Sequence, residues 1–269
     1  MSYLFLFKDR LTWNIPLLIG VFIILFLYVF LLKKTTPEKT PYTHIGLFFS
    51  GLCLFSSIIG SPLSALSHLS FSLHMIQMGI LYFIVPPLLL LGIPYDMYRL
   101  ITRLISFKLI RNGLLWAKTF LYIFAVLLFI YHLPIVIQTL SKHVFFQNAY
   151  LIVLFVLTFG MWWPIVSPHP KQRLSGKTLK RYVFISGLVI TPACLFFIMT
   201  AFLNSVENPF VSQVTAHLCL PSESNSFSLL PPPFNTQYDQ FIAGTLMLLL
   251  HKLGLMMSVK LKAKFMKSH

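Results

Sequence analysis

The chain has 269 residues, of which 57% are hydrophobic and only 10% are charged, and its mean hydropathy is +0.81. Soluble domains carry about 25% charged residues, so a soluble fold of this size would not cover itself with polar surface. The net charge of +15 does not indicate nucleic-acid binding, because the basic residues lie between apolar segments rather than on one soluble module.

Seven apolar segments follow one another along the chain. They are residues 15–32, 43–62, 71–94, 120–138, 147–166, 182–203 and 239–259. Each is close to the roughly 20 residues that a membrane-spanning helix needs. A helix is expected because open strands leave backbone groups unsatisfied in lipid. The sequence therefore predicts an all-α, polytopic membrane helix bundle with seven transmembrane helices, forming a single integral membrane domain over residues 1–269.

The basic residues are distributed unevenly between the connections. All of the 21 basic residues except Lys8, Arg10 and Lys142 follow the first, third or fifth segment, or lie from the end of the seventh onwards. Basic connections stay in the cytoplasm. The pattern predicts an N-terminus outside the cell and a C-terminus inside.

Two connections are longer than turns. Residues 204–238 are rich in Ser, Asn and Pro, and we expect this outer loop to be partly disordered or to form a small lid. Residues 95–116 mix basic and apolar side chains, and we expect them to lie along the inner membrane surface.

Polar residues open the third segment. His74 and Met78 are four residues apart, so they share one helical face; Met75 lies beside them and Tyr82 continues the stripe. In the predicted orientation this group lies in the outer part of the membrane. Imidazole and thioether ligands suit a soft ion such as Cu(I) better than Mg²⁺ or Ca²⁺. The alternative is packing, because Met often fills gaps and a single His can bond a neighbouring helix.

His132, in the "YHLP" motif, falls at a similar depth in the fourth segment. It is a candidate to meet His74 across a helix interface. The alternative is that its side chain bonds backbone groups freed by Pro134.

The seventh segment carries a second polar stripe. Gln240, Gly244, Met247 and His251 recur at helical spacing, so this face should turn toward protein rather than lipid. A small residue such as Gly244 permits close helix approach. Asp239, near the outer interface, is either an interfacial carboxylate or a functional one.

Neither catalytic motifs nor cysteine pairs stand out. The chain has no Ser-His-Asp arrangement, P-loop, GxGxxG motif or paired-carboxylate site with usable spacing, so nothing indicates an enzyme. The three cysteines are far apart and form no CxxC pair, which argues against a zinc site. Trp162 and Trp163, in "MWWPIVSP", are expected to form an interfacial aromatic anchor.

Several motifs together are similar to those of one family. The stretches "GSPLSALSHLSFSLHMIQM", "PPLLLLGIP", "YHLP", "WWPIVSPHP" and "DQFIAGTLM" resemble, in content and order, the cytochrome c oxidase assembly factor CtaG family of bacterial seven-span proteins. The resemblance runs from Tyr42 to Met257. It implies a multi-pass protein of the bacterial cell membrane that helps to mature a haem-copper oxidase, with cytochrome c oxidase subunits as partners and copper as a transiently bound ion.

The resemblance extends to individual residues. The matching positions are His74, Met75, His132, Asp239, Gln240 and Met247. The chain departs from the family at Met78, where many members carry a second His, and at Tyr150 and Leu151, where many carry a His in the fifth span. The resemblance thus implies copper ligands at the outer side, with Met78 in place of one imidazole.

Three functions remain open at this point. The leading one is a non-enzymatic assembly factor whose His and Met side chains hold copper while an oxidase subunit docks. The alternative is a membrane transporter, with His74, Met78 and His132 lining a route for metal or another small solute. The third is a structural partner of the oxidase that binds no metal. All three place the chain in membrane lipid, and none involves nucleic acid.

Overall fold

A computed structural model describes residues 13–35, 42–67, 69–105, 113–203 and 232–267. Within these ranges the regular structure is entirely helical, which confirms the predicted all-α class. Six helices are long and apolar enough to cross a membrane, and one bent helix pair makes up to seven spans in the described part of the chain. The chain is therefore a multi-pass membrane protein.

The helices lie close to the predicted segments. The spans are α1 (Ile15–Thr35); α2 (Tyr42–Phe55), continued by the π-helix η2 (Ser56–Gly60); α4 (Phe71–Gly79), continued by the π-helix η3 (Ile80–Ile84) and by α5 (Val85–Leu91); α7 (Gly113–Tyr131); α9 (Val144–Val166); α10 (Gly176–Leu203); and α12 (Gln237–Lys267). The shorter elements are α3 (Leu63–Ser67), α6 (Tyr95–Ile105), α8 (Pro134–Ser141) and η5 (Pro170–Gln172).

The fourth span differs from its prediction. The segment at 120–138 was expected to cross as one helix, but α7 ends at Tyr131 and α8 continues at an angle of 79°. Pro134 has no N–H for an interior helical turn, and it favours an extended residue before it. Leu133 is extended accordingly, and Pro134 begins the new helix. The prediction was wrong for residues 134–138, which do not continue the direction of the span.

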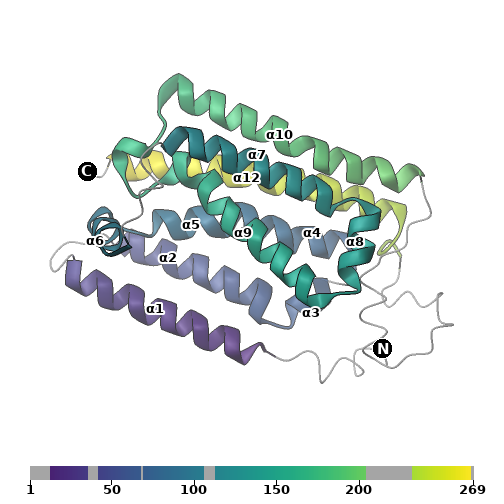
Figure 1. Cartoon of the computed structure of the whole chain (residues 1–269), viewed down its shortest axis with the longest axis horizontal. Coiled ribbons are helices and arrows are strands. Elements are labelled where there is room, and N and C mark those ends of the chain that lie inside the picture. The colour runs from purple at the N-terminus through teal and green to yellow at the C-terminus, as the bar shows by residue number, and fades with distance from the viewer. Residues whose placement is uncertain (1–12, 36–41, 68, 106–112, 204–231, 268–269) are drawn as a thin grey trace.

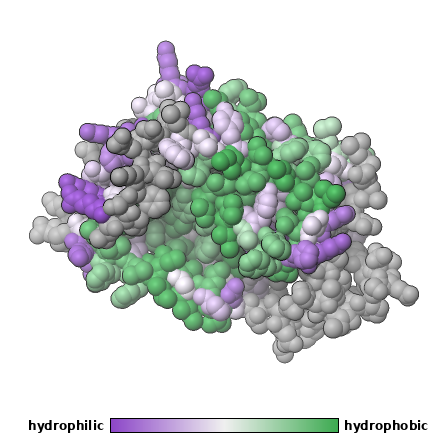
Figure 2. Space-filling model, in the orientation of Figure 1, coloured by the Kyte–Doolittle hydropathy of each residue, from purple (hydrophilic) through white to green (hydrophobic). Residues whose placement is uncertain are grey.

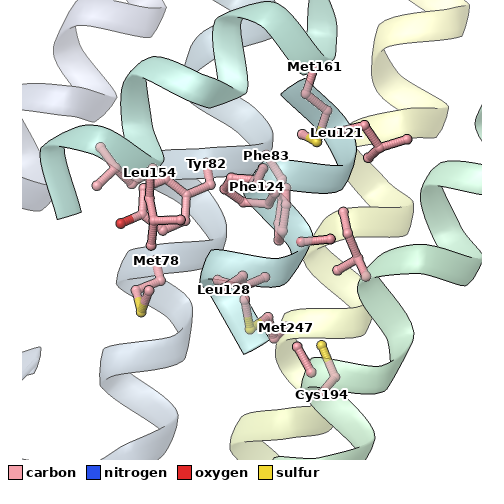
Figure 3. Close-up of a cluster of buried hydrophobic side chains, with 14 of the residues drawn as sticks. Met78, Tyr82, Phe83, Leu121, Phe124, Leu128, Leu154, Met161, Cys194 and Met247 are labelled. Atoms are coloured by element: carbon pink, nitrogen blue, oxygen red, sulfur yellow. The ribbon is translucent and has the colours of Figure 1, made fainter. Parts of the chain in front are cut away.

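The spans form one main core and a smaller flank. Side chains from α4, η3, α5, α7, α9, α10 and α12 make the large buried cluster, part of which Figure 3 draws. Helix α1 joins α2 and α6 in a second cluster, in which the Tyr28 ring stacks on Phe48 at 3.9 Å between centroids. The Tyr28 hydroxyl also donates to the Gly92 carbonyl at 2.8 Å. These contacts attach the first span to the core.

Helix α12 approaches its neighbours through glycines. A Cβ on Gly254 would lie 2.3 Å from the carbonyl oxygen of Phe83, and one on Gly244 would lie 2.5 Å from a side-chain carbon of Ile198. Small residues allow such close backbone approach in membranes. This contact confirms that the Gly244 face of α12 turns toward protein.

The helix termini gather at two ends of the molecule (Figure 1). We call the end that holds α6, η5 and the end of α12 the C-terminal end, and the end that holds α3, the start of α4 and α8 the α8 end. Figure 2 shows hydrophobic residues across the middle of one face and hydrophilic residues toward both ends, as a membrane-spanning bundle requires.

The connections match the predictions only in part. Helix α6 is seen nearly end-on in Figure 1 while the spans run across the view, so it crosses the direction of the spans, as expected of a surface helix. It ends at Ile105, residues 106–112 lie outside the described residues, and Gly113 already belongs to a span. The expected loop at 204–238 falls mostly on residues 204–231, which also lie outside the described residues.

Candidate functional site

The start of α4 carries His74 and is held by a carboxylate from α12. Asp239 accepts hydrogen bonds from the Ser70 hydroxyl at 3.0 Å, the Phe71 N–H at 2.9 Å and the Ser72 N–H at 3.3 Å. The first N–H groups of a helix have no partner within the helix, and a capping acceptor satisfies them. Asp239 therefore fixes the turn from which His74 projects.

The same carboxylate also holds the turn before α12. Asp239 accepts from the Asn235 N–H at 2.9 Å, and the Asn235 side chain donates to the Leu69 carbonyl at 2.7 Å. Asp239 is only 2% exposed. The sequence left open whether Asp239 is an interfacial carboxylate, and the structure makes it a buried one that joins two helix starts.

His74 is 3% exposed and contacts Tyr131, the last residue of α7. Its Nε2 lies 3.2 Å from the Tyr131 hydroxyl, and Tyr131 is in turn hydrogen-bonded to the Gln147 side chain of α9. All three side chains are buried. Tyr131 and Gln147 were not predicted from the sequence, although Tyr131 is the first residue of "YHLP" and Gln147 is a polar residue in an apolar segment.

His132 occupies the bend between α7 and α8. The His132 N–H bonds to the Phe129 carbonyl rather than to Leu128, as it would in a continuing α-helix. The His132 Nδ1 takes its place, 2.6 Å from the Leu128 carbonyl oxygen. Because a carbonyl only accepts, this bond assigns the proton to Nδ1 and leaves a lone pair on Nε2.

The Nε2 atom of His132 is buried and has no hydrogen-bond partner within the described part of the chain. The ring lies edge-on to Tyr131 and to Phe197, at 5.4 Å between centroids in each case. A buried polar atom without a partner is uncommon in proteins and needs an explanation. The sequence hypothesis of a His bonding backbone near Pro134 accounts for Nδ1 but not for Nε2.

Tyr131 brings the two histidines to one region. Its ring contacts those of His74, at 6.2 Å between centroids, and of His132. The predicted sulfur ligands are also buried: Met75 is 1% exposed, Met78 2% and Met247 1%. In Figure 3, however, Met78 and Met247 occupy separate places in the cluster, and Met247 lies toward Leu128 and Cys194.

The described residues contain no group of three or more His, Cys, Asp or Glu side chains that could hold a metal ion. A metal site at the α8 end therefore needs thioether sulfur beside imidazole nitrogen. That donor set suits Cu(I), which favours soft ligands, and does not suit Mg²⁺ or Ca²⁺.

The stripe on α12 faces protein, as predicted, but its residues bond different partners at different depths. Gln240 donates to the Phe197 carbonyl at 2.9 Å and to the Thr200 hydroxyl at 2.8 Å. The Nε2 of His251 lies 3.2 Å from the Ser186 hydroxyl. At 1.5 Å per residue, His251 is about 16 Å from Gln240 along the helix, so it belongs to another depth.

Gln77, a further polar residue of α4, has a packing role. Its amide donates to the Ile58 carbonyl in η2 at 3.1 Å, and its oxygen accepts from the Ser67 hydroxyl at 2.7 Å. These bonds connect α4 to η2 and α3.

The expected aromatic anchor is wrong for Trp162. This residue is fully buried, and its Nε1 donates to the Tyr82 carbonyl at 2.9 Å. Pro86, four residues after Tyr82, has no N–H to give that carbonyl, so Trp162 supplies the missing donor. Trp163 is only partly buried and donates to the Gln172 side chain at 2.9 Å.

Comparison with known proteins gives one family match. The model of the family described as cytochrome c oxidase caa3 assembly factor (Caa3_CtaG) matches residues 24–262. No curated protein and no solved structure matches the chain significantly.

Proposed function

The chain belongs to the cytochrome c oxidase caa3 assembly factor family, and on that premise we propose that it carries copper to the oxidase. Copper is cargo here, bound at the α8 end and released to an oxidase subunit, and the chain catalyses no reaction of its own. In a bacterial cell membrane the α8 end faces outward, as the distribution of basic residues predicts.

The observation that carries this proposal is that the Nε2 atom of His132 is buried without a hydrogen-bond partner among the described residues. Its Nδ1 bond to the Leu128 carbonyl holds the ring and directs the Nε2 lone pair into protein. Metal-binding histidines commonly donate their other ring nitrogen to a carbonyl or carboxylate in this way. A metal ion would satisfy this nitrogen, which has no partner in the part of the chain that the structure describes.

The surrounding side chains favour Cu(I) as that ion. His74 contacts the hydroxyl of Tyr131, the residue next to His132. The buried thioethers of Met75 and Met247 belong to the same core as Tyr131. Asp239 is the carboxylate described at this end, and its oxygens already accept several hydrogen bonds. Imidazole and thioether ligands are neutral, so they bind a soft monovalent cation without adding fixed charges of their own.

The first experiment measures Cu(I) binding by the purified protein against a competing chelator. His132→Asn keeps a donor for the Leu128 carbonyl, because the Asn amide takes the place of Nδ1, but removes Nε2. We expect its affinity to fall by at least about tenfold, as for other disruptions of metal sites. His143→Asn, at an exposed position, is the matched control and should bind as the unmutated protein does.

Unchanged Cu(I) affinity in folded His132→Asn would contradict the proposal. A second variant, His74→Ala with Met78→Leu, tests the stripe on α4 by Cu(I) binding and by active oxidase in the strain. If both quantities match the unmutated protein, that stripe serves packing alone. Copper flux across vesicles without oxidase would favour transport instead.

A further inference from the structure

The connection between α9 and α10, residues 167–175, folds back onto the helix bundle at the C-terminal end. The Leu174 N–H donates to the Pro164 carbonyl at 2.7 Å, and the Arg173 Nε donates to the Ser167 carbonyl. The Lys262 ammonium of α12 donates to the Leu174 carbonyl. This short connection is therefore fixed to two spans rather than extended into solvent.

Two cations meet in this folded connection. Lys262 is only 4% exposed, and Arg173 is partly buried. Burial lowers the pKa of Arg173 below its ordinary value. The Lys262 ammonium bonds the carbonyl of Leu174, the residue next to Arg173. Like charges packed together in a poorly solvated place are unfavourable unless an anion offsets them.

The described part of the chain gives these cations no anionic partner. Its carboxylates are Asp96 and Asp239. Asp239 lies 23 residues before Lys262 on α12, or about 35 Å along the helix. Asp96 is exposed on α6, and no ion pair joins it to Arg173 or Lys262 among the described residues.

Several donors of the pair remain available. A guanidinium has five N–H donors and an ammonium has three. Arg173 and Lys262 each use one, for a backbone carbonyl, within the described part of the chain. The planar fork of Arg matches phosphate oxygens well, and a nearby Lys adds a point charge.

Aromatic rings around the connection favour a position at the level of the lipid headgroups. His169 contacts the rings of Tyr95 and Tyr98 at 5.3 and 6.0 Å, and Tyr98 contacts Trp163 at 5.6 Å. Tyr and Trp gather at membrane interfaces because their rings are apolar at one end and polar at the other.

We propose that Arg173 and Lys262 bind the phosphate of an anionic phospholipid headgroup. The headgroup phosphate supplies the negative charge that the described residues do not provide, and it accepts hydrogen bonds from the remaining N–H donors. The apolar tails lie along the exposed surface of the neighbouring spans. This site is independent of the copper proposal, because it lies at the opposite end of the bundle.

The test compares lipid binding by the full chain in nanodiscs of phosphatidylcholine, with or without phosphatidylglycerol. Native mass spectrometry of the released protein counts retained lipids. We expect the unmutated chain to retain phosphatidylglycerol, and Arg173→Gln with Lys262→Gln to lose roughly tenfold or more of that preference. Lys177→Gln with Lys180→Gln removes the same charge from exposed positions of α10 and should keep it.

Two further outcomes would overturn the proposal. An equal loss in the Lys177 and Lys180 control would mean diffuse charge attraction, and displacement of the lipid by millimolar inorganic phosphate would mean a free-phosphate site. Lys262→Met keeps a side chain of similar volume at this buried position, and its melting temperature without added phosphatidylglycerol shows whether it is folded. Phosphatidylglycerol should raise the melting temperature of the unmutated protein more than that of Lys262→Met, and an equal rise would contradict the site.

Discussion

The buried polar side chains of the α8 end differ in whether their polar atoms have hydrogen-bond partners. Hydrogen bonds between helices use the polar atoms of Gln77, Asp239 and Gln240. His132 uses one ring nitrogen in this way, and its other ring nitrogen has no partner among the described residues. The difference matters because satisfied groups stabilise the fold, whereas an unsatisfied buried nitrogen costs stability and calls for a ligand.

Asp239→Asn tests the structural role of that carboxylate. The Asn side chain has only one oxygen, so its NH2 group faces either the N–H of Ser72 or the N–H groups of Phe71 and Asn235, and at least one buried donor loses its acceptor. Each such loss costs about 1–3 kcal/mol. Thermal unfolding in detergent should show a clearly lower melting temperature. Asp96→Asn is the matched control at an exposed carboxylate, and an equal shift in both variants would contradict the assignment.

The roles of single residues were partly visible in the sequence. The stripes on α4 and α12 follow helical spacing, so their burial could be predicted. The partners of Asp239 could not, because Ser70 and Phe71 lie 169 and 168 residues away along the chain. The burial of Trp162 likewise depends on a carbonyl that Pro86 leaves open 80 residues away.

The helices themselves follow hydrophobic length, and their exceptions follow proline and glycine. Each predicted segment overlaps a helix because an apolar run of membrane length has few other solutions in lipid. The bend at His132 and Leu133 was missed because a membrane helix often tolerates a proline, and only the neighbouring helices decide whether it bends.

Gly254→Ala tests the contact between α12 and η3. The added methyl group would meet the Phe83 carbonyl oxygen, which belongs to the backbone and has little freedom to move. Overpacking of this kind costs about 1–3 kcal/mol. We expect a lower melting temperature in detergent, with loss of the compact form on size-exclusion chromatography.

Gly187→Ala in α10 is the control for that variant, since a Cβ there meets no atom within 4 Å. Ala at an unhindered helical position should leave stability unchanged or raise it by about 0.5–1 kcal/mol. If Gly254→Ala is as stable as Gly187→Ala, the close approach of α12 does not limit the packing.

On the scale of the whole molecule, the spans give the bundle two chemically different ends. The α8 end holds His74, Tyr131 and His132, and the C-terminal end holds Arg173 and Lys262. The order of the spans, and the end at which each connection lies, could be predicted from the lengths of the apolar segments and from the basic residues of the connections. Their detailed neighbours could not, because contacts between spans are set by side-chain packing that a single sequence does not reveal.

Reporter fusions test the orientation of these ends. Fusions after Lys118 and Arg181 should both report the cytoplasm, because the basic connections are retained there. A fusion after Ser141, in α8, should report the outside. A cytoplasmic signal at Ser141 or an external signal at Lys118 would reverse the proposed topology and place the histidines on the wrong side for an outward delivery.

The most direct test of copper delivery is the metal content of the oxidase made by a strain that lacks this chain. Haem spectra and copper should be measured on the same purified oxidase. We predict an oxidase that contains haem but is deficient in copper and activity, restored by the unmutated chain and by His143→Asn but not by His132→Asn. A fully metallated, active oxidase made without the chain would contradict the proposed function.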